Sequence, residues 1–149
     1  MAIPDYYQPM RRIVTGVDST GHSCLVVDSQ ATQTEVTPDY VLDDLWSMGL
    51  PAEVAGSTEL PEPPGADITE GVVLWRRCTI PAGVEIGFHS TDTVDWVTVL
   101  SGAVTLLLES GQVDLSPGDC VVQRNTLHGW RNHGTEPCIL IAAMASVAG

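Results

Sequence analysis

The sequence predicts an all-β protein built as an antiparallel barrel or sandwich, and three observations lead to this fold class. Short runs rich in β-branched residues recur at close spacing from Gly71 onward. Turn-forming residues separate these runs, and no helix-length periodic segment interrupts them, which argues against parallel βαβ units. The runs are VVLWRRCTI, VEIGF, DWVTVL, AVTLLLE, QVDLS, CVVQR, HGWRN and CILIAAM.

Residues 1–70 are predicted to form an N-terminal extension that packs on this barrel. Two short strands are expected around Arg12–Thr15 and Cys24–Asp28, because β-branched residues gather there. Asp18 and Gly21 lie between them, and both are typical turn residues.

A helix is expected over residues 37–48. Thr37 can cap its start, Pro38 suits the first turn, and Asp39 suits the positive end of the helix dipole. Gly49 can end it. The predicted apolar stripe is Val41, Leu42, Leu45 and Trp46.

The segment 51–70 is rich in Pro, Gly and acidic residues, so it is predicted to be a long surface loop over the barrel mouth. Residues 71–149 then form the barrel core. Because the chain has only 149 residues, we expect the extension and the barrel to make a single structural domain.

Composition excludes several classes of partner. The formal net charge is −13, from 19 acidic against 6 basic residues, which disfavours nucleic acid and anionic membranes. No run of apolar residues is long enough to span a membrane, and the N-terminus lacks a secretory signal pattern, so a cytoplasmic protein is expected. The four cysteines are far apart, and Cys78, Cys120 and Cys138 lie in apolar, strand-like runs, which predicts buried structural thiols rather than zinc ligands or disulfides.

Two segments carry polar residues that strand alternation would place on one face. A turn at residues 91–93 would also bring Asp95 back towards the first segment. If both faces point into the barrel, their polar groups cluster there. The alternating positions are Glu85, Gly87, His89 and Thr91 in the first segment, and His128, Trp130 and Asn132 in the second.

These segments resemble the two motifs of the cupin family. The first family motif, G-x5-H-x-H-x3/4-E-x6-G, is matched by Gly83, His89, Thr91, Asp95 and Gly102. The second, G-x5-P-x-G-x2-H-x3-N, is matched by Gly118, His128 and Asn132, with one residue fewer before the histidine and without the proline and glycine. The resemblance covers roughly residues 71–145. It implies a double-stranded β-helix, or jelly-roll barrel, that is usually a dimer and holds its active site inside the barrel.

The resemblance assigns roles residue by residue. His89, Asp95 and His128 match family metal ligands, whereas Thr91 occupies the place of a further histidine and Asp95 that of a glutamate. Two interpretations stay open. In one, the three residues hold one divalent ion (Fe, Zn or Ni) as a 2-His-1-carboxylate face. In the other, no metal is bound, and the same residues are an acid–base set with Thr91 as an orienting hydroxyl.

Four further residues are candidate substrate contacts. Trp130 would form a pocket wall that can stack on a flat ligand. Glu85 shares the predicted face of His89, Asn132 shares that of His128, and Arg76 could bind an acidic group of the substrate.

The predicted function is that of a small-molecule enzyme. The similarity to small stand-alone cupins of secondary-metabolite pathways favours a dehydratase-like lyase, or a decarboxylase or isomerase, acting on a cyclic or aromatic polyketide-type intermediate. The alternatives are a metal-dependent dioxygenase or other oxidoreductase, and a cupin that binds a small ligand without turnover. A homodimer is expected from the same resemblance.

Overall fold

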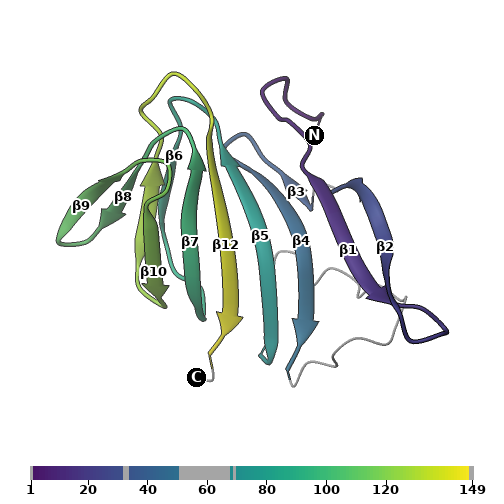
Figure 1. Ribbon diagram of the computed structural model, residues 1–149. Coiled ribbons are helices and arrows are strands. Elements are labelled where there is room, and N and C mark those ends of the chain that lie inside the picture. The colour runs from purple at the N-terminus through teal and green to yellow at the C-terminus, as the bar shows by residue number, and fades with distance from the viewer. Residues whose placement is uncertain (1, 32–33, 51–67, 69, 148–149) are drawn as a thin grey trace.

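The computed structural model describes residues 2–31, 34–50, 68 and 70–147. Within them the chain forms strands only, arranged as two facing sheets and a separate hairpin (Figure 1). The strand order is β10-β7-β12-β5-β4-β3 in the larger sheet and β6-β11-β8-β9 in the smaller one. The all-β jelly-roll prediction is therefore confirmed.

The elements are β1 (Arg11–Val17), β2 (Ser23–Gln30), β3 (Glu35–Val36), β4 (Val41–Gly49), β5 (Val72–Ile80), β6 (Glu85–His89), β7 (Thr93–Ser101), β8 (Val104–Leu108), β9 (Gly111–Leu115), β10 (Cys120–Arg124), β11 (His128–Arg131) and β12 (Cys138–Ser146).

The core lies between the two sheets because strand alternation sends every second side chain inward. In β7, Val97 and Val99 are buried, whereas Trp96 just before them and Leu100 just after them are exposed. The inward side chains pack on those of the facing sheet, Trp130 among them. This packing leaves one face of the larger sheet turned away from the core.

Gly102 shows why the first motif ends in glycine. Its backbone has φ +74°, a conformation that side chains with a Cβ rarely adopt. A Cβ there would also meet the carbonyl oxygen of Pro137 at 2.5 Å. The turn after β7 therefore requires glycine in order to bring β12 alongside.

The predicted helix over 37–48 is wrong, because residues Val41–Gly49 form strand β4. Thr37 closes a tight turn instead of capping a helix. Its amide donates to the Tyr40 carbonyl, and its hydroxyl oxygen accepts from the Tyr40 amide. Asp43 and Asp44 then pair with arginines of β5 on opposite faces of the sheet. Only strand alternation separates neighbouring residues in this way, so long-range pairing overrides the local helical pattern.

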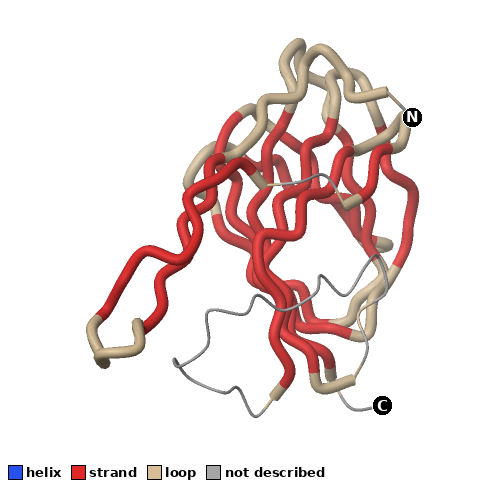
Figure 2. Tube along the Cα trace, turned by 90° about the vertical axis from the view of Figure 1, so that its right-hand side faces the viewer, coloured by secondary structure: helices blue, strands red, loops and turns tan. Residues whose placement is uncertain are grey.

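The two short strands expected at the N-terminus are confirmed as the antiparallel pair β1–β2. Figure 2 shows this hairpin standing away from the other strands. The predicted loop over 51–70 falls almost wholly outside the described residues. All four cysteines are free, as predicted, but of the three expected to be buried only Cys138 is; Cys78 is half-buried and Cys120 is exposed. Among the described residues, no helix has the length and apolar character needed to cross a membrane.

Candidate active site

A cavity of about 470 Å³ opens between the two sheets. Its size falls in the range of small-molecule sites, about 300–1,000 Å³. The wall combines many apolar side chains with a few polar ones. The lining residues are Glu35, Tyr40, Leu42, Arg76, Cys78, Ile86, Gly87, His89, Thr91, Asp95, Val97, His128, Trp130, Leu140, Ala142 and Met144.

Two histidines meet in this cavity, as the sequence predicted. His89 of β6 and His128 of β11 are directly paired in the strand register, and their ring centroids are 4.4 Å apart. His128 is buried, whereas His89 is exposed. The edge of the His128 ring meets Trp130, with 5.7 Å between ring centroids.

Backbone carbonyls fix the tautomer of both imidazoles. The Nδ1 atom of His89 lies 2.8 Å from the Gly87 carbonyl oxygen, and Nδ1 of His128 lies 2.8 Å from that of Thr126. Because a carbonyl oxygen can only accept, Nδ1 carries the proton in each ring. Each neutral ring therefore keeps its basic lone pair on Nε2. Burial lowers the pKa of His128, with a smaller lowering from the charge of His89, which favours the neutral base.

Asp95 of β7 contributes a buried carboxyl group. It is 6% exposed, and its Oδ1 atom is buried without a hydrogen-bond partner. Burial raises the pKa of Asp95, while a hydrogen bond from Thr93 and the charges of Arg76 and His89 oppose the rise. This carboxyl group therefore keeps its proton to higher pH than an ordinary aspartate.

A chain of hydroxyl groups leads from the cavity to Asp95. The Oγ1 atoms of Thr91 and Thr93 are 2.8 Å apart, and Thr93 in turn hydrogen-bonds to Asp95. Thr93 is 1% exposed and was not among the predicted site residues. Its position two residues before Asp95 on the same strand was the signal that it shares the inward face.

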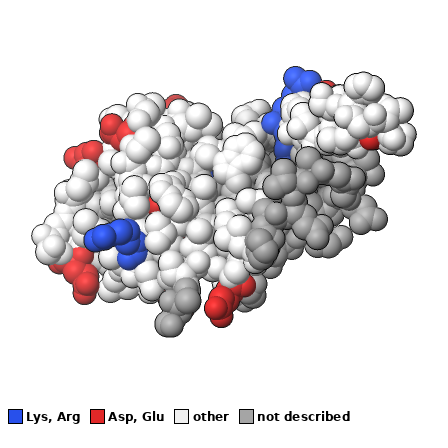
Figure 3. All heavy atoms as spheres, turned by 60° about the horizontal axis from the view of Figure 1, so that its bottom comes forward, with Lys and Arg blue, Asp and Glu red and all other residues white. Residues whose placement is uncertain are grey.

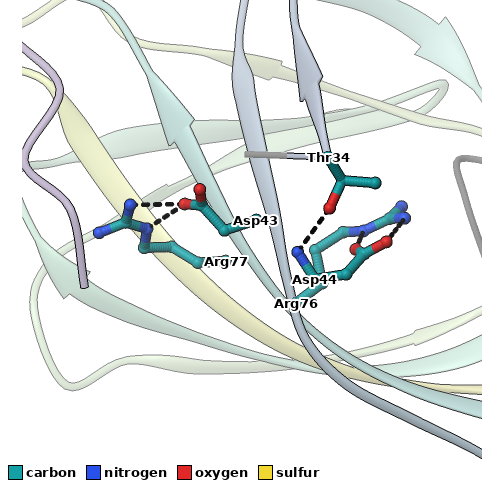
Figure 4. Close-up of polar contacts among 5 residues, drawn as sticks. All are labelled: Thr34, Asp43, Asp44, Arg76 and Arg77. Carbon is teal, nitrogen blue, oxygen red and sulfur yellow. Dashed lines mark hydrogen bonds and ion pairs between the residues drawn. The ribbon is translucent and has the colours of Figure 1, made fainter. Parts of the chain in front are cut away.

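Arg76 lies in the cavity wall, bound by its own carboxylate partner. Its Nε and Nη2 atoms lie 2.6 and 3.2 Å from the two oxygens of Asp44, and the Asp44 amide donates to Thr34 Oγ1 (Figure 4). Arg77 and Asp43 form the corresponding pair on the opposite side of the strands (Figure 4). Of two adjacent arginines, the fold thus directs Arg76 to the cavity.

A further polar pair lines the cavity and was missed by the sequence reasoning. The Tyr40 hydroxyl donates to Glu35 Oε1 at 3.1 Å, and both side chains come from the N-terminal extension. β3 and β4 stand at one end of the larger sheet, three to four strand spacings from Asp95 on β7. At about 4.8 Å per spacing, this distance is roughly 14–19 Å along the sheet. No motif in the sequence marked these residues.

Glu85 and Asn132, two predicted substrate contacts, lie outside the cavity lining. Glu85 is exposed and pairs with Arg131, its carboxylate 2.6 Å from Nε. A β-bulge explains this placement: His128 pairs with His89 but Trp130 pairs with Ile86, so β6 holds one extra residue and its alternation reverses. Ile86, predicted to face away, lines the cavity instead.

Asn132 is fully buried, and its side chain forms hydrogen bonds to backbone groups. Its amide nitrogen donates to the carbonyl oxygens of Ile80 and Glu136, at 3.0 and 2.9 Å, and its Oδ1 accepts from the Gly134 amide. The second motif's asparagine is therefore structural.

The side chains do not form a ready metal centre. The histidines fit in kind, since each has a free Nε2 and a carbonyl-bound Nδ1. However, among the described residues no group of three or more His, Cys, Asp or Glu side chains is placed so that it could hold an ion. His89, His128 and Asp95 lie around one cavity without converging on a common point.

The sequence is similar to those of known proteins. The family model described as "Cupin domain" matches residues 76–144. Phomopsin biosynthesis cluster protein C' of Diaporthe leptostromiformis is 41% identical over 80 residues, which cover 53% of this chain and 42% of that protein. The cupin-domain-containing oxidoreductase fogC of Aspergillus ruber is 30% identical over 139 residues, which cover 85% of this chain and 67% of that protein. The chain thus spans 42% of the length of the first of these relatives.

Among solved structures, the cupin domain of Schizosaccharomyces pombe Cnp3 aligns with a TM-score of 0.59. The alignment covers 95% of this chain and 90% of that chain at 12% sequence identity. At this identity the likeness supports the fold alone.

Proposed function

The chain belongs to the cupin family, and from that premise we propose that it is a small-molecule enzyme, a dehydratase-like lyase of secondary metabolism that works by acid–base chemistry. The observation that carries the proposal is the buried Asp95 carboxyl group, whose Oδ1 has no hydrogen-bond partner, in the same cavity as two imidazoles with free Nε2 atoms. An unpaired buried carboxyl oxygen is costly for folding, which makes a functional role the better explanation.

The directions of two pKa shifts support one assignment of the proton-transfer roles. His128, held neutral by burial, removes a proton from the carbon beside a substrate carbonyl through Nε2. Asp95, whose pKa burial raises, donates its proton to the departing hydroxyl, which leaves as water while the carbon–carbon double bond forms.

Two threonines orient the acid. Thr93 holds one side of the Asp95 carboxyl group, and Thr91 holds Thr93 from the cavity side. Thr91 is then a positioning residue whose hydroxyl can also contact a substrate oxygen. Thr91 is the residue that stands where the family motif has a histidine.

The cavity wall indicates the class of substrate. Its lining is mainly apolar, and Trp130 offers an aromatic surface for a flat ring. The Glu35–Tyr40 pair gives the cavity a second polar region that would accept a substrate hydroxyl. These features support a cyclic or aromatic substrate, and the similarity to a phomopsin biosynthesis cluster protein of Diaporthe leptostromiformis supports a role in a biosynthetic pathway.

The proposal is tested by proton exchange on a panel of cyclic β-hydroxy ketones and phenolic analogues in D2O. Nuclear magnetic resonance would follow deuterium entry beside the carbonyl, and mass spectrometry would follow loss of water. We expect His128→Asn and Asp95→Asn each to lower the rate of water loss by about 10²–10⁴-fold. Glu85→Gln, outside the cavity, is the matched control and should keep full activity.

An oxidoreductase is the second candidate, because fogC, which the chain matches over most of its length, carries that name. Metal analysis and oxygen uptake separate the two. Stoichiometric iron with substrate-dependent oxygen uptake, and no proton exchange in metal-free protein, would overturn the acid–base proposal. A ligand that binds and is recovered unchanged would favour the non-catalytic alternative.

A further inference from the structure

Gln123 is a buried polar side chain next to the proposed acid. It lies on β10 and is 4% exposed. In the strand register it stands directly opposite Asp95 of β7. Side chains of such a cross-strand pair share one face of the sheet, and their Cβ atoms are about 4.5–5.5 Å apart. Gln123 therefore lies beside Asp95 on the face that is turned towards the smaller sheet.

The amide group of Gln123 also reaches the backbone that orients the proposed base. Its Nε2 atom donates to the Thr126 carbonyl oxygen at 3.3 Å and contacts Thr126 Oγ1. The same carbonyl oxygen lies 2.8 Å from Nδ1 of His128 and accepts its proton. Because a carbonyl oxygen has two lone pairs, it can accept from both donors at once. The group that fixes the tautomer of His128 is thus itself held by Gln123.

The turn that carries Thr126 has an unusual backbone. Asn125 has φ +47°, in the left-handed region, which asparagine tolerates better than most other residues. Its amide donates to the Thr93 carbonyl at 2.9 Å, and the Thr93 side chain hydrogen-bonds to Asp95. Such backbone conformations persist where surrounding contacts hold them, and they gather at active sites. The turn is therefore tied to the strand that carries the acid.

The surroundings of this turn offer few other restraints. Both β10 and β12 run antiparallel to β7, so the turn after β10 lies at the lower end of Figure 1, near the C-terminus. Figure 3 brings this end forward, and on the face that it shows the charged side chains stand at separate places on a broad uncharged surface. The turn also lacks the proline of the second family motif, whose ring would fix the backbone. The hydrogen bonds of Gln123 and Asn125 therefore restrain it.

We propose that Gln123 is a positioning residue of the active site, which holds the Thr126 carbonyl so that the proton of His128 stays on Nδ1 and Nε2 stays free as the base. This inference rests on the base role proposed for His128. Gln123 is not part of the cavity lining, so it acts through His128 and not on the substrate. Because Gln123 stands opposite Asp95, it also links the position of the base to that of the acid.

Nitrogen-15 magnetic resonance of the histidine rings in the ligand-free full chain tests the proposal without a substrate. Spectra are recorded at about pH 8, where imidazoles are neutral, and the His128 signals are identified by their loss in His128→Asn. We expect the Nδ1–H tautomer in wild type. In Gln123→Met, which keeps the length of the side chain without its hydrogen bonds, the tautomer ratio should shift about 3- to 10-fold towards Nε2–H. Gln123→Leu is a second variant with the same expected result.

Turnover is the second measurement. Gln123→Met should lower kcat about 3- to 10-fold and change KM by less than about twofold, because the residue orients the base without touching the substrate. A general loss of stability would not produce this separation of kcat from KM in folded protein. Circular dichroism should show that each variant is folded.

Thr105→Val is the matched control, because it also removes a buried hydrogen bond. Thr105 is 1% exposed and donates to Asp114 at 2.7 Å, away from the turn after β10. It should leave the His128 tautomer and kcat unchanged. Unchanged His128 signals in Gln123→Met, an equal shift in Thr105→Val, or a wild-type His128 with its proton on Nε2 would each overturn the proposal. A wild-type chain without turnover would instead overturn the lyase function, while the ring signals would still decide the role of Gln123.

Discussion

Replacement of Arg77 by leucine should be among the most destabilising single changes in this protein. The Nε and Nη2 atoms of Arg77 both lie 2.5 Å from Asp43 Oδ2, and the two side chains are 3% and 0% exposed. Leucine would leave Asp43 as a fully buried carboxylate with the Tyr7 hydroxyl as a remaining donor. Breaking such a pair from one side costs about 3–5 kcal/mol, because the remaining charge stays desolvated.

That cost is a large share of the stability of a domain of this size, which is about 5–15 kcal/mol. It corresponds to a fall in melting temperature of roughly 6–20 °C. Urea denaturation followed by tryptophan fluorescence would give the free energy of unfolding for wild type and variant. Replacing Asp43 by leucine as well should recover part of the loss, since the uncompensated charge is then gone.

The matched control is Arg11→Leu, which breaks the exposed pair that Arg11 forms with Asp28 at 2.7 Å. Water and salt screen that pair, so we expect no measurable change. If Arg77→Leu were no more destabilising than Arg11→Leu, the buried pair would not contribute to the free energy of unfolding as predicted.

Three further predictions concern the cavity and the second motif. The pH profile of kcat/KM should be bell-shaped, with its maximum on the acidic side of neutrality. The reason is that burial lowers the pKa of His128 from 6.5 and raises that of Asp95 from 3.8. A maximum at alkaline pH would refute these roles. Asp95→Asn should raise the free energy of unfolding at neutral pH by about 1 kcal/mol. Because the pKa of Asp95 is higher in the folded than in the unfolded state, its ionisation destabilises the fold above the unfolded pKa. The gain should therefore vanish as the pH falls towards 3.8, which urea titrations at several pH values would show. Asn132→Ala should lower the free energy of unfolding by at least about 2 kcal/mol by orphaning buried backbone groups, whereas Glu85→Ala should leave it nearly unchanged.

Local patterns in the sequence predicted the barrel well. Alternation and turn residues are properties of neighbouring positions, so the strands after Gly71 and the inward placement of His89, Asp95 and His128 could be deduced. The motif glycine Gly102 was informative because its backbone conformation excludes other residues.

The errors arose where distant segments decide the local structure. Residues 41–49 have a helical apolar pattern, yet Asp43 and Asp44 meet arginines more than thirty positions away. Glu85 was misplaced because the bulge in β6 depends on its pairing with β11, where a Cβ at Gly129 would meet the Ile86 carbonyl at 2.8 Å. Glu35 and Tyr40 were missed because only the pairing of β4 with β5 brings them to the cavity.

The two neighbouring Asp–Arg pairs of β4 and β5 also fix the alignment of these strands. Asp43 pairs with Arg77 on one face, and Asp44 pairs with Arg76 on the other. A shift by one residue would keep one aspartate opposite an arginine and place the other opposite Trp75 or Cys78, so only the observed alignment pairs both carboxylates. Insertion or deletion of a single residue in Val41–Asp43 should therefore be tolerated far less than a point substitution there. Such a register shift would part Asp43 from the Tyr7 hydroxyl and Asp44 from Arg76 at the same time.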